Sequence, residues 1–204
     1  MKNILCYGDS NTFGFNPVDG SRYKKQERWT GVLSEILGNQ YNVIEEGCNN
    51  RTMYFKNAAG FEQSGCEYFC ECLKKYDKLD WAILALGVND TQFLYDATED
   101  TFKQGMLCLI EKVYKKFPEI KILILGPSVI KHDILNSFFA QMFDENSIEK
   151  SKNICKVYEN IAKEQGCFFI DLNYIAETSN IDGLHYGVEE NRKIATAIAR
   201  VIDG

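Results

Sequence analysis

Two short stretches at opposite ends of the chain carry side chains that could act together as a nucleophile and its activating base. Gly8-Asp9-Ser10-Asn11 follows the first predicted strand, and Asp182-Gly183-Leu184-His185 lies near the C-terminus. A serine hydroxyl is a poor nucleophile at neutral pH and needs a neighbouring imidazole to take its proton. A carboxylate beside the imidazole fixes its tautomer and stabilises the imidazolium that forms. Because the chain has only two histidines, a serine hydrolase reaction here would use His185 as the base and Asp182 as its carboxylate.

The context of Ser10 favours a position at the edge of a sheet. Residues 3–7 form a short run with strand character, and Gly8 permits the turn that follows. Ligands of open α/β folds bind at the carboxyl edge of the sheet, where this turn would lie. Asn11 and Thr12 follow Ser10, so the Gly-x-Ser-x-Gly elbow of the α/β-hydrolases is absent. Taken alone, the stretch is more typical of a strand-to-loop turn with a polar cap, because short motifs recur by chance.

Two further polar clusters come at the ends of predicted strands. Residues 47–52 (Gly-Cys-Asn-Asn-Arg-Thr) follow the second strand, and residues 87–90 (Gly-Val-Asn-Asp) follow the third. Asn and Asp are common turn residues, so each cluster by itself indicates only a turn. Parallel strands deliver their carboxyl ends to one edge, however, and four such clusters would converge there. The sequence therefore predicts a polar site at that edge.

The chain alternates strand-like and helix-like segments, which favours a parallel sheet with helices on both faces. Near-continuous apolar runs such as 81–86 are typical of strands that are covered on both faces. No linker, repeat or low-complexity stretch interrupts the pattern, so we expect one domain over residues 1–204. The predicted strands are roughly 3–7, 41–46, 80–86, 120–126 and 167–171, and the predicted helices are roughly 29–38, 61–76, 98–117, 146–165 and 187–202.

Two irregular segments interrupt the alternation. Residues 8–28 are expected to form a long loop, and residues 127–145 form a second insertion. Apolar residues recur in pairs four apart within 134–143, which predicts a short amphipathic helix. This helix could pack on the domain, form the wall of a pocket or bind another subunit, which would make the protein a homo-oligomer.

Length, charge and cysteine spacing exclude several classes of function. A length of 204 residues suits one α/β domain, and the net charge of −6 argues against a general affinity for nucleic acid or for an anionic membrane surface. No apolar run approaches membrane-spanning length. The chain enters its first strand without the features of a secretory signal, so we expect a cytoplasmic protein. Its eight cysteines lack zinc-type spacing, and we expect reduced, mostly buried thiols and no metal.

Taken together, the motifs resemble those of the SGNH hydrolases, also called the GDSL family. The resemblance spans nearly the whole chain in the family's order, and Arg28-Trp29 adds a likeness to the aryl esterase, acetyl-xylan esterase and acyltransferase branch. It implies a three-layer α/β/α fold with a five-stranded parallel sheet, flavodoxin-like in its order of elements. The matching blocks are residues 8–14, 45–52, 86–90 and 182–185.

The resemblance also implies roles for individual residues. Ser10 would be the nucleophile, His185 the general base and later the general acid, and Asp182 the orienting carboxylate. The oxyanion hole would use the backbone N–H groups of Ser10 and Asn50 and the side-chain amide of Asn89. Donors of this kind typically contribute about 3–4 kcal/mol each to the transition state. His132 is expected to be a solvated loop residue.

Asn50 departs from the family pattern, which usually has glycine at this oxyanion position. The donor is a backbone N–H, so a side chain need not remove it. Asn also tolerates a positive φ better than most residues do. The side chain could still narrow the acyl pocket or add a polar contact.

The function implied is a serine esterase that hydrolyses short-chain acyl esters, acetyl esters on sugars among them, through an acyl-enzyme. It would act on a small molecule and need no cofactor. Two alternatives stay open at this point. One is a lysophospholipase or thioesterase of the same fold. The other is a non-catalytic flavodoxin-like binding protein, although no Gly-rich phosphate loop is present and the Asp182–His185 pair would be unexplained.

Overall fold

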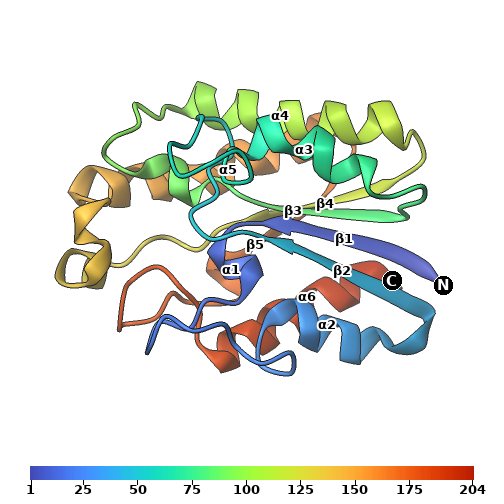
Figure 1. Ribbon diagram of the computed structural model, residues 1–204, viewed down its shortest axis with the longest axis horizontal. Coiled ribbons are helices and arrows are strands. Elements are labelled where there is room, and N and C mark those ends of the chain that lie inside the picture. The colour runs from blue at the N-terminus through green and yellow to red at the C-terminus, as the bar shows by residue number, and fades with distance from the viewer.

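A central parallel sheet with helices on both faces forms the structure, a computed structural model that describes all residues 1–204 (Figure 1). The strands pair in the order β2-β1-β3-β4-β5, and every pair is parallel. The predicted α/β fold class and the five-stranded sheet are confirmed. The strands are β1 (Lys2–Gly8), β2 (Tyr41–Gly47), β3 (Trp81–Ala85), β4 (Lys121–Gly126) and β5 (Phe168–Asp171).

Five longer helices form the two outer layers. One face of the sheet is covered by α2 (Trp29–Leu37) and α6 (Val188–Asp203), and the other by α3 (Gly65–Lys74), α4 (Glu99–Lys116) and α5 (Glu145–Gln165) (Figure 1). Both termini lie at the end of the molecule where the strands begin. None of the helices combines the length and the hydropathy that a membrane crossing would need.

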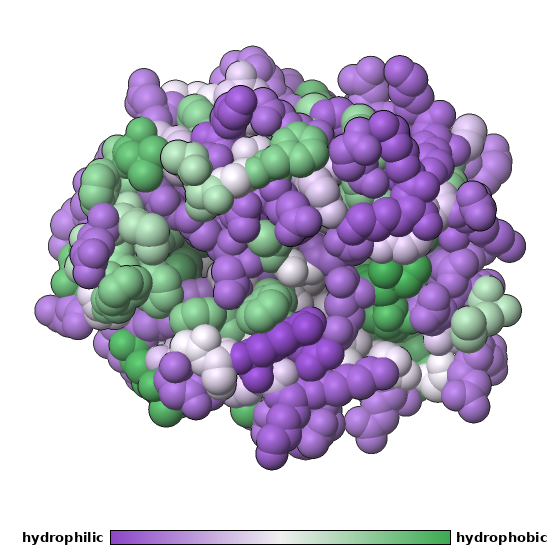
Figure 2. Space-filling view, in the orientation of Figure 1, coloured by the Kyte–Doolittle hydropathy of each residue, from purple (hydrophilic) through white to green (hydrophobic).

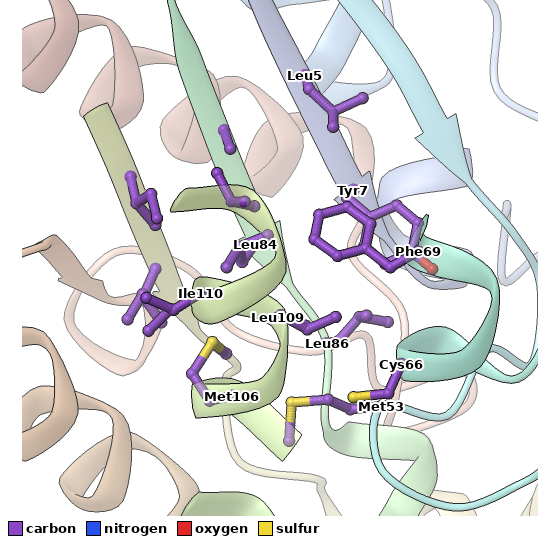
Figure 3. Packing of buried hydrophobic residues seen from close by; sticks show 14 of the residues in the cluster. Leu5, Tyr7, Met53, Cys66, Phe69, Leu84, Leu86, Met106, Leu109 and Ile110 are labelled. Carbon is purple, nitrogen blue, oxygen red and sulfur yellow. The ribbon is translucent and has the colours of Figure 1, made fainter. Parts of the chain in front are cut away.

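The sheet separates two hydrophobic clusters, because alternate residues of each strand point to opposite faces. Leu5 and Tyr7 of β1 pack with Phe69 under α3 and α4, as Figure 3 shows. Ile4 and Cys6 of the same strand pack in the other cluster, under α2 and α6. All four β1 side chains are fully buried, which explains the near-continuous apolar runs of the sequence.

Strand register brings the loops of the site together. Gly8 at the end of β1 pairs with Gly47 at the end of β2 and with Ala85 at the end of β3. The next residues of all three strands therefore leave the sheet at the same level. A short helix, α1 (Ser10–Phe13), packs directly over the end of β2, where a Cβ on Gly47 would collide with the backbone nitrogen of Phe13.

The prediction of a loop over residues 8–28 is wrong at its start, since α1 occupies residues 10–13. Asp9 caps this helix through its carboxylate, which accepts the Asn11 N–H at 2.9 Å. Gly14 ends it in the left-handed region at φ 88°. Caps at both ends thus confine a single helical turn, and a hydrophobic periodicity cannot reveal a helix so short.

The predicted helix over 61–76 is also shorter than expected, because it begins at Gly65. Residues 61–63 precede the helix, and Thr52 of the preceding loop donates its N–H to the Gln63 carbonyl at 3.0 Å. Ser64 is the N-cap, whose carbonyl accepts the Tyr68 N–H at 2.9 Å. The Ser64 hydroxyl accepts the N–H of Asn57 at 2.9 Å and donates to the carbonyl of Gly60 at 3.1 Å.

The prediction of one amphipathic helix over residues 134–143 is wrong. Two short 3-10 helices, η3 (His132–Asn136) and η4 (Phe138–Gln141), occupy the segment. Ser137 divides them, since its hydroxyl donates to the Ile134 carbonyl at 2.8 Å and accepts the Phe139 N–H at 3.1 Å. A side chain that bonds both to the turn before it and to the turn after it competes with a continuous helix.

Gly47→Ala should lower the free energy of unfolding by about 2 kcal/mol or more, because the added methyl meets backbone that cannot move without displacing α1. Thermal unfolding followed by circular dichroism measures this loss. Gly187→Ala is the matched control: its Cβ would meet nothing within 4 Å, and we expect it to cost less than about 1 kcal/mol. Equal losses in the two variants would contradict the packing argument.

Candidate active site

Three of the predicted residues meet at the carboxyl edge of the sheet. The Nε2 atom of His185 lies 2.8 Å from the Oγ atom of Ser10, although 175 residues separate them in the chain. The Nδ1 atom of His185 lies 2.7 Å from Oδ2 of Asp182, and all three side chains are buried. An ionised carboxylate can only accept, so Nδ1 carries the proton and the lone pair of Nε2 faces the serine. This is the arrangement in which a histidine can remove a serine proton.

Asp182 is held by the turn that carries the histidine. Its Oδ1 atom accepts the backbone N–H groups of Leu184 and His185, each at 3.0 Å. Burial raises the pKa of the Asp182 carboxyl, but the hydrogen bonds from His185 and Leu184 outweigh burial and leave the pKa below its usual range. The carboxylate is therefore ionised at neutral pH, as an orienting partner of the imidazole must be.

Two aromatic rings pack on the imidazole. The ring centroid of Phe15 lies 4.2 Å from that of His185, at an interplanar angle of 31°. The ring of Phe139 lies 5.1 Å from the same imidazole. These contacts restrict the ring of His185 to one orientation. Sequence reasoning missed both residues, because an isolated Phe in a loop carries no signal of the ring that it will contact.

The predicted oxyanion donors line the same cavity as Ser10 and His185. This cavity has a volume of about 90 Å³. Asn50 has a φ of 59° and is the sole non-glycine residue in the left-handed region, so its backbone has the conformation that a glycine would adopt. The Asn50 N–H donates to no acceptor within the chain. The side-chain Nδ2 of Asn89 donates one hydrogen to the Arg51 carbonyl at 3.1 Å, which leaves its second hydrogen free.

Buried polar side chains position these two loops. The carboxylate of Asp90 accepts three successive backbone N–H groups, those of Met53, Tyr54 and Phe55, at 2.6, 2.8 and 3.2 Å. It thereby ties the loop after β2 to the end of β3. The sequence placed Asp90 beside Asn89 but did not indicate this role.

Asn11 joins the nucleophile's helix to the histidine's loop. Its Nδ2 donates to the Leu184 carbonyl at 3.3 Å, and its Oδ1 accepts the Tyr186 N–H at 3.3 Å. Asn11 and Asp9 therefore support the loops around the site. The second histidine, His132, is remote from this network: its side chain is 72% exposed and lies 3.4 Å from Glu145.

The segment 132–143 packs in the core and also forms the wall of the cavity. Ile134 and Phe143 are buried in a small hydrophobic cluster with Leu184. Phe139, Met142 and Phe143 line the cavity beside Ser10. Outside the cavity, hydrophobic residues gather over this end of the molecule (Figure 2), and Phe138 is 73% exposed there. Two of the three roles left open by the sequence are thus combined in one segment.

The parallel sheet with helices on both faces, and the hydroxyl, imidazole and carboxylate in series at its carboxyl edge, are the arrangement of an α/β serine hydrolase. Residues 6–191 match the GDSL-like lipase/acylhydrolase family. The chain therefore belongs to this family and is a carboxylic ester hydrolase, which makes the non-catalytic alternative wrong. Its substrates are small-molecule esters.

Solved structures of similar proteins agree with this assignment. Est24, a carbohydrate acetylesterase from Sinorhizobium meliloti, is 30% identical with a TM-score of 0.92, over 100% of this chain and 99% of that chain. The native aryl esterase of M. smegmatis is 31% identical with a TM-score of 0.91, over 100% and 99%. A G-D-S-L family protein from Veillonella parvula shares the fold alone, at 16% identity and a TM-score of 0.73 over 100% and 99%. No curated protein sequence matches the chain.

Asp9 should make the stability of the protein depend on pH. Burial raises the pKa of its carboxyl to about 7, against the opposing effects of the Asn11 N–H and the nearby charge of Arg51, while Asp90 raises it further. The folded protein then binds this proton more tightly than the unfolded chain, whose Asp has a pKa of about 3.9. The contribution of Asp9 to stability is therefore largest below about pH 4 and falls as the pH rises to about 7.

Asp9→Asn keeps an oxygen acceptor for the Asn11 N–H and removes the titration. We expect its Tm relative to that of the wild type to rise between pH 4 and pH 8, as measured by thermal unfolding in matched buffers. Taking the difference between the two proteins cancels the titrating groups that do not interact with Asp9, and leaves the titration of Asp9 together with its interaction with Asp90. A Tm difference that stays constant over this range would contradict the assignment.

Proposed function

We propose that this chain is a serine esterase that hydrolyses short-chain acyl esters, above all acetyl esters, through an acyl-enzyme. The observation that carries the proposal is the series of contacts from Ser10 Oγ to His185 Nε2 at 2.8 Å and from His185 Nδ1 to Asp182 at 2.7 Å, at the edge of a small cavity. In this proposal Ser10 is the nucleophile, His185 the general base and acid, and Asp182 the carboxylate that orients it.

Acylation begins when Ser10 Oγ attacks the carbonyl carbon of the ester while His185 Nε2 takes the hydroxyl proton. The tetrahedral intermediate carries its negative charge on the former carbonyl oxygen. The N–H groups of Ser10 and Asn50 and the free hydrogen of the Asn89 amide would donate to that oxygen. The N–H of Ser10 lies in the first turn of α1, where backbone donors have no acceptor within the helix. Collapse of the intermediate breaks the ester C–O bond, and His185 gives its proton to the departing alcohol.

Deacylation repeats these steps with water. His185 Nε2 removes a proton from the water as its oxygen attacks the acyl carbon, and the same donors hold the second oxyanion. When this intermediate collapses, Ser10 regains its proton from His185 and the carboxylic acid leaves. Throughout, the ionised carboxylate of Asp182 stabilises the imidazolium, which is the charged species formed in each half-reaction.

The size of the cavity supports a short acyl group. Its volume of about 90 Å³ is well below the roughly 300–1,000 Å³ of pockets that enclose drug-sized ligands. Its apolar wall is formed by Phe139, Met142, Phe143 and Leu184. A long acyl chain, as in a lysophospholipase, would need a channel past these side chains.

The relatives support an acetyl ester whose alcohol is aryl or a carbohydrate, because one is an aryl esterase and another a carbohydrate acetylesterase. The alcohol would lie in a neighbouring pocket, which Phe15, Phe138 and Phe139 line and which shares Phe15 and Phe139 with the cavity beside Ser10. Flat apolar rings can pack against a phenyl group or against the apolar face of a sugar. One sheet shared by both hydrophobic clusters also supports a single hydrolase domain over residues 1–204.

Ser10→Ala should abolish hydrolysis of nitrophenyl acetate, lowering kcat at least about 10³-fold, while the Tm stays within a few degrees of the wild type. A fluorophosphonate should label the wild-type protein once, at Ser10, as read by peptide mass spectrometry. Thr12→Ser, two residues further along α1 and outside the cavity lining, serves as the control that keeps activity. Label at another residue, or full activity in Ser10→Ala, would refute the nucleophile.

Met142→Ala should enlarge the acyl cavity and shift the preference toward longer chains. For the wild type we expect kcat/KM to fall about tenfold or more from acetyl to octanoyl nitrophenyl esters. In the variant the kcat/KM for the octanoyl ester, divided by that for the acetyl ester, should rise several-fold. Phe138→Ala, whose ring does not line this cavity, should leave the ratio unchanged. The proposed acyl position would be wrong if both variants behaved alike.

A further inference from the structure

The buried amide side chain of Gln92 connects the two proposed oxyanion residues, Asn50 and Asn89. Gln92 lies directly after the 3-10 helix η2 (Val88–Thr91), and only 1% of its surface is exposed. Its Nε2 atom donates to Oδ1 of Asn50 at 2.8 Å and to Oδ1 of Asn89 at 3.2 Å. Gln92 does not line the cavity beside Ser10. The loop after β2 and the loop after β3 therefore meet at one side chain that would not itself touch the substrate.

The direction of each amide in this chain follows from its partners. The Arg51 carbonyl can only accept, so Asn89 must present Nδ2 to it. Asn89 then presents Oδ1 to Gln92, and the Nε2 group of Gln92 must donate to it. The second hydrogen of that group faces Oδ1 of Asn50. A flip of any one amide would set two acceptors or two donors against each other, so the network has a single consistent arrangement.

The network acts on the two donors in different ways. Asn89 is held at both ends of its amide, which prevents rotation and aims its remaining hydrogen in a fixed direction. Asn50 has a strained left-handed backbone at φ 59°. Its side chain is held by Gln92, and its carbonyl accepts Nδ2 of Asn57 at 2.7 Å. These two bonds restrain the side chain and the carbonyl of Asn50, and so limit the backbone rotation that would turn its N–H.

We propose that Gln92 is a positioning residue that sets the oxyanion donors Asn50 and Asn89 in one geometry, with the Asn50 side chain serving as its contact where a glycine would offer none. This inference rests on the proposed function, because it assigns Gln92 through the donors named there. Its effect is expected in kcat, since the donors act on the oxyanion of the transition state more than on the bound ester.

The test measures kcat and KM for nitrophenyl acetate in Gln92→Met, which keeps the length of the side chain and removes its donor. Rates are divided by the number of active sites titrated with a fluorophosphonate, so that an unfolded fraction does not enter. We expect kcat to fall about 10- to 100-fold with KM changed less than about twofold. Gln92→Glu, which sets an acceptor against both Oδ1 atoms, should be at least as impaired. The exposed Gln26→Met is the matched control and should keep the wild-type rate.

A double-mutant cycle separates positioning from a general structural role. Gln92→Met lowers kcat by a certain factor in the wild type. In the Asn89→Ala background this factor should shrink to about a third or less, because one of the two residues that Gln92 contacts has lost its amide. When Asn50→Gly is present as well, Gln92→Met should have no further effect on kcat. An equal factor in all three backgrounds, or a wild-type kcat in Gln92→Met, would overturn the proposal.

Ser10→Ala distinguishes failure of this inference from failure of the proposed function. If Ser10→Ala is inactive while Gln92→Met keeps the wild-type kcat, the esterase assignment stands and the role of Gln92 is refuted. If Ser10→Ala retains activity, the proposed mechanism itself is wrong and the role of Gln92 fails with it.

Discussion

A buried guanidinium holds the carboxyl end of the sheet together. Arg51 Nη1 donates to the carbonyls of Gly8 and Glu46, at 3.0 and 2.6 Å, and Nε donates to the carbonyl of Glu62 at 2.7 Å. The charge lies over the ring of Tyr7, 4.4 Å from its centroid. One side chain thus joins the ends of β1 and β2 to the loop that follows. The planar, multiply donating shape of arginine makes this possible, and a lysine could not reproduce it.

The site depends on this contact because its residues stand on loops. The backbone carbonyl of Arg51 accepts Nδ2 of Asn89, so the residue that joins β1 to β2 also holds the end of β3. Asp9 and Asp90, both buried nearby, have pKa values raised to about 7 and about 6, chiefly by burial. Keeping ionisable groups in such surroundings is unfavourable for stability. Asp90 accepts three consecutive N–H groups and Asp9 accepts that of Asn11, and these bonds give the loops a rigidity that apolar side chains could not supply.

The second irregular segment contributes the shape of the cavity. It is divided into two 3-10 helices by Ser137, and the offset between them turns Phe139 toward His185 while Ile134 and Phe143 remain in the core. A continuous helix would have placed its apolar side chains along one stripe. The broken form distributes them over two surfaces, so that one segment packs against the domain and also limits the space next to Ser10.

The sequence by itself determined the parallel sheet, the helices on both faces and the family. These follow from local signals: apolar runs of strand length, helical periodicity, and short motifs whose residue types and order are specific. It also named Ser10, Asp182, His185, Asn50 and Asn89 as candidates, because each belongs to such a motif. The tertiary structure alone decided which atoms meet. The 2.8 Å contact between residues 175 positions apart and the amide of Gln92 between two loops depend on strand register and on packing across the sheet. No local pattern encodes these relations, since each involves segments whose separation in the chain carries no information about their distance in space.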